Sequence, residues 1–272
     1  MTAKTLQART VLITGASSGI GRMTALMMAR EGTRLALVAR RLDRLEEVVK
    51  EVEAKGGVAA AFPGDVTVPG TMEAVVHGCL SRFGRLDVLV NNAGAGLFAA
   101  TEQTTEEDLD RIMAVNFKGT FYGIKAALPV MRKQGAGHII NVASTAGRRG
   151  SPYIGAYCAS KFAVVGLTES LRVELLGSGI NVSLVCPGAT RTAFFNVALR
   201  RTRQHSGLVG PVESSERVAA RIIGVVRRPR AEVLAQPFRR KIFLTLNLIF
   251  PGLVDRLVSR VISSAMSRNE HE

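Results

Sequence analysis

The stretch TGASSGIG, residues 14–21, decides the fold of this chain. It follows an apolar, β-rich run at 10–15 and opens a helical pattern at 20–31. Gly15 can turn the chain sharply, Gly19 lets the backbone approach a pyrophosphate, and Gly21 permits close packing of helix on sheet. The free N–H groups and positive dipole end of the helix favour an anion. The loop therefore predicts a dinucleotide-phosphate site after the first strand.

Strands and helices alternate along the rest of the chain. Apolar runs predict strands at 10–15, 34–40, 58–62, 86–90, 138–142, 180–185 and 231–235. Helix-like segments lie between them at 20–31, 42–55, 71–83, 106–133, 153–176 and 214–227. Continuous apolar strands separated by helices indicate a parallel sheet covered on both faces. We predict an α/β fold with one doubly wound domain over 1–236, followed by a helical C-terminal extension over 237–272 that is not an independent domain.

The end of the second strand bears on the choice of cofactor. The strand ends in VARR, residues 38–41, and no acidic residue follows until Asp43. Enzymes that use NAD usually have Asp or Glu here, which holds the ribose 2′-hydroxyl. Two guanidinium groups suit a 2′-phosphate instead. Arg40 and Arg41 therefore favour NADP(H) over NAD(H), although arginines that only face solvent at a helix start would give the same pattern.

YCASK, residues 157–161, places Tyr157 and Lys161 one turn apart on one helix face. In isolation, two amphipathic side chains with packed stems would explain the pair. Beside it we set Ser144, which follows the strand-like HIINVAS at 138–144, and Asn116, a polar amide on the apolar side of a long helix. Alone, Ser144 would be a turn residue and Asn116 a satisfied core amide.

Together these motifs resemble the short-chain dehydrogenase/reductase superfamily over about residues 8–236. The resemblance rests on TGASSGIG, Asp65-Val66, NNAG at 91–94, Asn116, Ser144, the Tyr157/Lys161 pair, and Pro187-Gly188 followed by Thr192. It implies a Rossmann-like domain with a seven-stranded parallel sheet and a nicotinamide cofactor. It also implies an enzyme that interconverts a carbonyl and a secondary alcohol by hydride transfer, in which Asn91 helps to hold the central sheet together.

The resemblance assigns roles residue by residue. Tyr157 would be the acid/base, Lys161 its electrostatic partner, Ser144 the group that holds the substrate oxygen, and Asn116 the anchor of a proton-relay water. Free tyrosine titrates at about 10, and we expect the ammonium, with an oxidised nicotinamide, to lower that pKa. The implied cofactor-binding residues are Gly15, Ser17, Ser18, Gly19, Ile20, Gly21, Arg40, Arg41, Asp65, Val66, Asn92, Ala93, Gly94, Tyr157, Lys161, Pro187, Gly188 and Thr192.

One residue departs from the family pattern. Ser18 stands where some NADP-preferring members have a basic residue, so the NADP preference rests mainly on Arg40, with Arg41 assisting.

Substrate specificity should come from segments beyond three strand ends, around 96–98, 146–153 and from 193 onward. These contain Leu97, Phe98, Pro152, Tyr153, Phe194 and Phe195, which predict an apolar substrate unless some of them are core. The polar segment RRTRQHSG, 200–207, predicts a mobile lid. The family resemblance further predicts a homodimer or homotetramer.

The C-terminal segment 241–268 repeats apolar residues at helical spacing, and Pro251 should break or kink it. Arg239, Arg240 and Lys241 precede this run. An apolar stripe beside basic residues suits an anionic membrane surface. It equally suits a cover over the substrate pocket or an interface with a second subunit, and the sequence leaves these alternatives open.

The composition limits the remaining classes of function. The net charge is +14, and twelve Arg or Lys against three Glu lie between Arg191 and Lys241. The basic residues lack interleaved stacking aromatics, and no zinc-finger or helix-turn-helix pattern is present, so nucleic acid is not a predicted partner. Intact Ser144, Tyr157 and Lys161 argue against the alternative of a catalytically silent, NADP-binding regulatory or scaffold protein.

Cysteine use and apolar runs bear on metal binding and location. Three scattered cysteines and four separated histidines give no metal-ligand spacing and suit a reducing compartment. The N-terminal MTAKTLQART lacks the apolar core of a signal peptide. The run IFLTLNLIF at 242–250 falls short of the roughly 20 residues that span a bilayer. We predict no metal and a cytoplasmic location, with membrane association through the tail as the alternative.

Overall fold

The computed structural model describes residues 6–192, 194, 198–202, 212–235 and 237–269. Within this part of the chain, seven parallel strands form one sheet in the order β11-β7-β6-β4-β1-β2-β3. They are β1 Thr10–Thr14, β2 Arg34–Ala39, β3 Val58–Pro63, β4 Val88–Asn91, β6 Gly137–Val142, β7 Ile180–Cys186 and β11 Glu232–Leu234. The predicted Rossmann-like, doubly wound α/β fold with seven parallel strands is confirmed.

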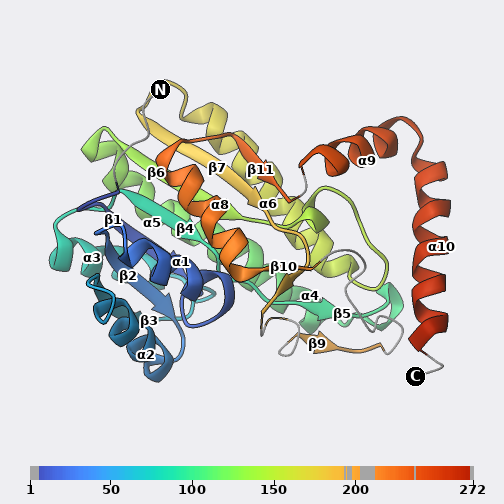
Figure 1. Ribbon diagram of the computed structural model, residues 1–272, viewed down its shortest axis with the longest axis horizontal. Coiled ribbons are helices and arrows are strands. Elements are labelled where there is room, and N and C mark those ends of the chain that lie inside the picture. The colour runs from blue at the N-terminus through green and yellow to red at the C-terminus, as the bar shows by residue number, and fades with distance from the viewer. Residues whose placement is uncertain (1–5, 193, 195–197, 203–211, 236, 270–272) are drawn as a thin grey trace.

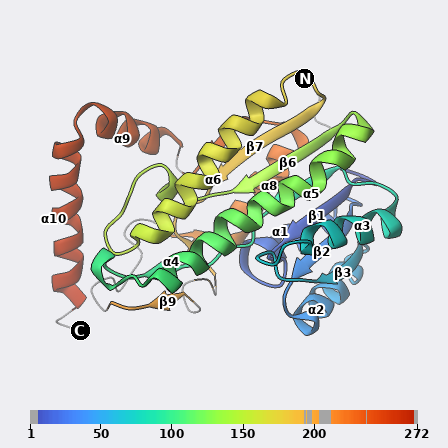
Figure 2. The same cartoon turned by 180° about the vertical axis from the view of Figure 1, so that it is seen from behind.

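Helices cover both faces of the sheet (Figures 1 and 2). One face packs against α1 Gly19–Ala29, α2 Leu42–Glu53 and α8 Ser215–Arg227, and the other against α3 Thr71–Phe83, α5 Gly119–Gln134 and α6 Gly155–Glu174. Each face has its own apolar core cluster, and the strands between them are almost completely buried. Burial on both sides explains why the strands read as continuous apolar runs.

The order of the strands places a crevice beside β1. The chain winds from β1 outward through β2 to β3, then returns to β4 on the other side of β1. In such sheets the crossovers diverge at this reversal, so the carboxyl ends of β1 and β4 leave room for a ligand. TGASSGIG follows β1 and NNAG begins at the last residue of β4, so both motifs lie at this point.

The predicted helix over 106–133 is interrupted. It consists of α4 Glu106–Met113, a π-helical segment Ala114–Lys118, and α5. The fully buried Asn116 lies in the π-helical segment, whose wider turn is a common feature of functional sites. Hydrophobic periodicity alone cannot detect such an insertion. The predicted helix over 153–176 also begins later, at Gly155, because Tyr153 has a positive φ of 62°.

Short elements surround the carboxyl edge of the sheet. Two-residue strands pair in parallel, β5 Leu97–Phe98 with β9 Leu199–Arg200, and β8 Thr190–Arg191 with β10 Glu213–Ser214. Two 3-10 turns, Thr101–Gln103 and Thr145–Gly147, complete this region. These pairings join segments that are far apart in the sequence and too short to carry a periodic signal.

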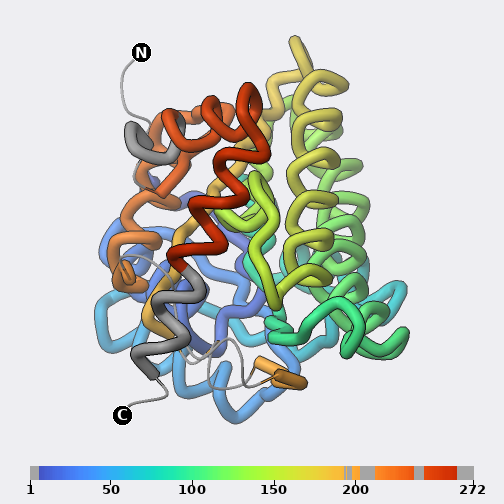
Figure 3. The backbone as a smooth tube through the Cα atoms, turned by 90° about the vertical axis from the view of Figure 1, so that its right-hand side faces the viewer, coloured from blue at the N-terminus to red at the C-terminus, as the bar shows by residue number. Residues whose placement is uncertain are grey.

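The C-terminal segment forms two helices, α9 Pro237–Ile249 and α10 Pro251–Asn269. The predicted break at Pro251 is confirmed, and the proline occupies the first helical position, where its missing N–H costs least. Figures 1 and 3 show α10 standing across the side of the molecule to which the strands point. No described helix has the length and apolar character needed to cross a bilayer. The predicted domain boundary at 236 stays a prediction.

Candidate functional site

A cavity of about 1010 Å³ opens at the carboxyl edge of the sheet. It brings together most of the residues singled out in the sequence. Those that line it are Gly15, Ser17, Ser18, Gly19, Ile20, Arg40, Arg41, Asp65, Val66, Asn92, Ala93, Gly94, Ser144, Tyr157, Lys161, Pro187, Gly188 and Thr192. Gly21 and Asn116 lie behind this lining.

The glycine-rich loop is tightly packed at three positions. Gly15 has a φ of 66° and Gly19 a φ of 52°, both in the left-handed region. A Cβ on Gly19 would lie 3.2 Å from the side chain of Thr192, on the opposite wall of the cavity. A Cβ on Gly21 would lie 2.4 Å from the carbonyl oxygen of Gly15 and 2.6 Å from Nδ2 of Asn92. The loop therefore presents backbone rather than side chains at the start of α1.

Gly21→Ala is expected to lower the free energy of unfolding by about 1–3 kcal/mol, because α1 must move away from β1 to admit the methyl group. Chemical denaturation measures this change. Gly224→Ala in α8 is the matched control: it has no atom within 4 Å of the added Cβ, and helix propensity predicts a gain of about 1 kcal/mol. Equal effects at both positions would contradict the close packing of Gly21.

The end of β2 lies open at the cavity. Arg40 and Arg41 are exposed and line it, and Arg41 occupies the position directly before α2. The first acid after them, Asp43, is in an ion pair with Arg44 at 3.9 Å. At the same end of the cavity, Asp65 Oδ1 accepts hydrogen bonds from the backbone N–H and the hydroxyl of Thr67, at 2.9 and 2.8 Å. This end of the cavity therefore offers two cations and a fixed carboxylate.

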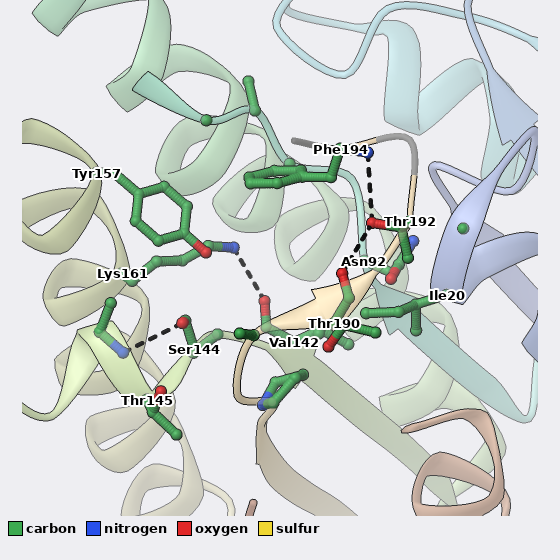
Figure 4. Close-up of a pocket in the computed structure, with 18 of the residues that line it drawn as sticks. Ile20, Asn92, Val142, Ser144, Thr145, Tyr157, Lys161, Thr190, Thr192 and Phe194 are labelled. Atoms are coloured by element: carbon green, nitrogen blue, oxygen red, sulfur yellow. Dashed lines mark hydrogen bonds between the residues drawn. The ribbon is translucent and has the colours of Figure 1, made fainter. Parts of the chain in front are cut away.

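The other end of the cavity holds Tyr157, Lys161 and Ser144 (Figure 4). Lys161 is 4% exposed, its Nζ donates to the carbonyl of Val142 at 3.1 Å, and it lies 5.9 Å from the centre of the Tyr157 ring. Tyr157 is half-buried and contacts Phe194 edge-on at 5.9 Å between ring centres. The spacing predicted from YCASK is confirmed, since α6 presents both polar tips to the cavity.

In the chain without cofactor, the pKa of Tyr157 lies above its ordinary value. Burial raises it to about 12, and a hydrogen bond with Ser144 acts in the opposite direction without overcoming the burial. Burial also lowers the pKa of Lys161 to about 8. The expected lowering of this pKa by the Lys161 ammonium together with an oxidised nicotinamide concerns the complex with cofactor and stays a prediction. Desolvation is the largest cause of both shifts, and the sequence spacing does not reveal it.

Ser144 lies two residues after the end of β6, near the start of the connection to α6. Its Oγ accepts from the backbone N–H of Ala146 at 3.1 Å and caps the 3-10 turn that follows. This contact fixes the hydroxyl rotamer at the cavity wall, within hydrogen-bonding reach of Tyr157.

Asn116 is a buried amide whose side-chain oxygen and nitrogen both have hydrogen-bond partners. Its Oδ1 accepts from Ala95 N at 2.8 Å, and its Nδ2 donates to Ala95 O at 3.0 Å and to Ser160 Oγ at 2.9 Å. It thus joins the segment after NNAG to the residue before Lys161. A Cβ on Gly94 would lie 3.3 Å from its Oδ1. Its role as a water anchor stays a prediction.

Asn91 links strands of the central sheet through its side-chain amide. Asn91 Nδ2 donates to Asn141 Oδ1 at 2.9 Å, and Asn141 donates in turn to Thr168 Oγ1 at 2.9 Å. The chain of amides crosses from β4 to β6 to α6, so Asn91 links the central sheet as expected.

Only some of the apolar residues predicted to contact the substrate line the cavity. Leu97, Phe98 and Phe194 line the cavity, whereas Pro152 and Tyr153 do not. Phe195 and the part of the predicted lid at 203–207 lie outside the described residues. The first lid residues are held in place, because Arg201 forms an ion pair with Asp108 at 2.9 Å.

Several cavity residues were missed from the sequence. Glu213 accepts from Gly188 N at 2.9 Å and pairs with Arg221 at 2.6 Å, which ties the Pro187-Gly188 loop to α8. Glu213 is one of three Glu among the twelve Arg or Lys between Arg191 and Lys241, and this charge pattern did not single it out. Arg149 and Phe243 also line the cavity, and the apolar C-terminal stripe, for which a cover over the substrate pocket was one open alternative, contributes Leu257, Val258 and Val261.

Comparison with known proteins gives a consistent picture. The model of the family described as "short chain dehydrogenase" matches residues 9–203. The 17-beta-hydroxysteroid dehydrogenase 13 of Rattus norvegicus is 34% identical over 261 residues, which cover 95% of this chain and 84% of that protein.

Two solved structures are similar. A short-chain dehydrogenase/reductase from Burkholderia phymatum in complex with NAD has a TM-score of 0.84 and 28% identity, covering 92% of this chain and 96% of its own. A metagenomic short-chain oxidoreductase in complex with NADP has a TM-score of 0.73 and 32% identity, covering 85% and 98%.

Proposed function

Because the chain belongs to the short-chain dehydrogenase/reductase superfamily and is an oxidoreductase, we propose that it interconverts a carbonyl and a secondary alcohol on an apolar small molecule, with NADP(H) as cofactor. The observation that carries the proposal is the convergence of Tyr157, Ser144 and Lys161 in one cavity with the glycine-rich loop. A fold used only for binding would not require that convergence.

The residues present fit a nicotinamide dinucleotide. The left-handed glycines and the backbone at the start of α1 leave a cradle that side chains at Gly15 and Gly19 would fill. Gly15, Ser17, Ser18, Gly19 and Ile20 would hold the phosphates, Asp65 and Val66 the adenine, and Asn92, Ala93, Gly94, Pro187, Gly188 and Thr192 the nicotinamide half, while Gly21 lets α1 pack closely behind the loop. When bound, the cofactor supplies or accepts the hydride.

Arg40 carries the preference for NADP over NAD. It is exposed at the cavity edge beside Arg41, at the strand end where an acid would select NAD. Since structural relatives include both an NAD and an NADP complex, the fold does not decide this preference. Two guanidinium groups at this position favour the 2′-phosphate by charge and by geometry.

In the direction of reduction, Tyr157 donates its hydroxyl proton to the carbonyl oxygen, while Ser144 Oγ hydrogen-bonds the same oxygen. The phenolate left behind is costly, because burial holds the pKa of Tyr157 at about 12. Lys161, as an ammonium held by the carbonyl of Val142, stabilises that phenolate and thereby lowers the barrier. Asn116 positions the Ser160–Lys161 turn and anchors the water that returns a proton.

Screening the purified protein with NADPH against ketones and aldehydes tests the proposal. We expect loss of the reduced-nicotinamide absorbance with at least one apolar ketone, and slower loss when NADH replaces NADPH. NADPH binding without turnover on any carbonyl or secondary alcohol would instead favour the silent regulatory or scaffold protein.

The pH dependence follows from Lys161, whose pKa burial lowers to about 8. As pH rises through that value the ammonium loses its proton, so the cation that stabilises the phenolate is lost. We expect kcat/KM for reduction to fall by up to about tenfold per pH unit above it. NADPH affinity measured over the same range is the control. A kcat/KM that stays flat through this range would contradict the role of Lys161.

The proposal extends to location and assembly. We propose a cytoplasmic homodimer or homotetramer that binds a small-molecule substrate and no nucleic acid. Peripheral membrane contact through the tail is the alternative for localisation. Light scattering on the purified full chain measures the assembly, and sedimentation with anionic vesicles measures the membrane contact.

A further inference from the structure

The tail helices contribute one wall of the cavity. Phe243 from α9 and Leu257, Val258 and Val261 from α10 line it, and these are the tail residues among the described lining. All four are apolar. The tail wall therefore differs from the cofactor end, where Arg40, Arg41 and Asp65 lie.

The tail packs against the catalytic domain at defined points. Leu244 of α9 packs against the apolar cluster of Ala143, Val164, Val165, Leu184, Cys186 and Leu234, between α6 and β7. Val254 of α10 is only 2% exposed. Apolar burial of Leu244 therefore seats α9 on the domain, which resists displacement of this part of the wall.

Arg149 ties both tail helices to the loop that begins at Ser144. Its Nε donates to Asn247 Oδ1 of α9 at 2.8 Å, and its Nη2 pairs with Asp255 Oδ1 of α10 at 2.5 Å. Its guanidinium also lies 5.8 Å from the centre of the Phe243 ring, and its side chain is 13% exposed. Arg149 thus fixes the position of the tail helices relative to the loop that carries Ser144, the residue proposed to bind the reacting oxygen.

The α10 part of this wall leaves hydrocarbon exposed. Leu257 is 49% exposed and Val261 is 54% exposed, although both line a cavity. Apolar surface left open in a concave site gains free energy when an apolar ligand covers it. The wall also has no polar group of its own to orient such a ligand, so the orientation must come from Ser144 and Tyr157.

We propose that Phe243, Leu257, Val258 and Val261 form an apolar subsite that binds an aliphatic chain of the substrate, remote from the reacting carbonyl. This inference rests on the proposed function, because the carbonyl must lie at Tyr157 for the chain to reach the tail. The substrate class is an unbranched lipophilic ketone or its secondary alcohol, and Arg149 is the residue that positions the subsite.

A homologous series of ketones tests the subsite. We expect kcat/KM of the full chain with NADPH to rise from 2-butanone to 2-dodecanone by about two- to fourfold per methylene, as each methylene leaves water. No dependence on chain length in the wild-type protein would overturn the proposal.

Paired variants on α10 locate the effect. Leu257→Gln combined with Val261→Gln should lower the ratio of kcat/KM for 2-dodecanone to that for 2-butanone at least tenfold, about 1.4 kcal/mol. Leu253→Gln is the matched control, since Leu253 is 55% exposed on the same helix and does not line the cavity. Its ratio should equal that of the wild type. An unchanged ratio in the double variant, or an equal loss in the control, would reject the subsite.

Arg149→Ala tests the positioning role. We expect KM for 2-dodecanone to rise at least fivefold with a smaller change in kcat, and Arg149→Lys, which keeps the charge beside Asp255, to restore part of the loss. A loss confined to kcat and equal for short and long ketones would assign Arg149 to Ser144 alone and overturn the positioning of the tail.

A binding measurement separates this inference from the proposed function. Nile red fluorescence, displaced by 2-dodecanone, reports the subsite without turnover. We expect displacement in the wild type and in Tyr157→Phe, and at least tenfold weaker displacement in the Leu257/Val261 double variant. If no carbonyl is reduced but this pattern holds, the apolar site stands and the proposed reaction fails. Displacement that is equal in the double variant and the wild type overturns the site itself.

Discussion

Tyr157→Phe is expected to lower kcat for carbonyl reduction by about 10²–10⁴-fold while NADPH affinity stays within about twofold. The substitution keeps the ring and its edge contact with Phe194, and removes only the hydroxyl that would donate the proton. Stopped-flow or steady-state absorbance measures kcat, and fluorescence titration measures NADPH affinity.

Tyr122→Phe provides the control. Tyr122 is on α5, packs against the apolar cluster between α3, α5 and the sheet, and does not line the cavity, so loss of its hydroxyl should leave kcat unchanged. A Tyr157→Phe enzyme with the wild-type rate would remove Tyr157 from the chemistry. A parallel loss of NADPH affinity would show that the variant damages the site as a whole rather than a single proton transfer.

Arg40→Asp is expected to weaken NADPH binding by about 10- to 100-fold and to leave NADH binding unchanged or stronger. The change removes a hydrogen bond to a charged group, worth about 1.5–3 kcal/mol, and adds repulsion of the 2′-phosphate. A carboxylate at this strand end can also accept a hydrogen bond from the 2′-hydroxyl of NADH. Calorimetric Kd values for both cofactors provide the measurement.

Arg44→Asp separates the local contact from the general charge of the surface. Arg44 is exposed one turn into α2 and is paired with Glu47 at 3.0 Å, so it should not affect the discrimination between cofactors. Equal losses of NADPH and NADH affinity in Arg40→Asp would refute the assigned preference, as would an equal shift in Arg44→Asp.

The order of strands and motifs along the chain was enough to predict most residues of the site. In parallel sheets every strand ends at the same edge, so residues that follow β1, β4, β6 and β7 must converge whatever the details of packing. That rule brings the glycine-rich loop, NNAG, Ser144 and Pro187-Gly188 together. Tyr157 and Lys161 needed only the helical period to share a face.

Side-chain contacts between segments far apart in the chain could not be predicted from the sequence. Arg149 meets Asn247 and Asp255 about a hundred residues later in the chain, and no pattern in the sequence couples these positions. The same holds for Glu213 with the Gly188 loop. Asn116 read as a polar interruption of one long helix, while the π-helical turn around it depends on its bonds to Ala95 and Ser160.

The sequence by itself therefore determined the parallel α/β fold, the phosphate loop and the pairing of Tyr157 with Lys161, because short-range periodicity and strand order dictate them. Only the tertiary structure decided which way the pKa of Tyr157 moves, since desolvation depends on what surrounds the phenol. It also decided that the tail faces the cavity. An apolar stripe defines one side of a helix, but the surface that covers it is set by contacts from elsewhere in the chain.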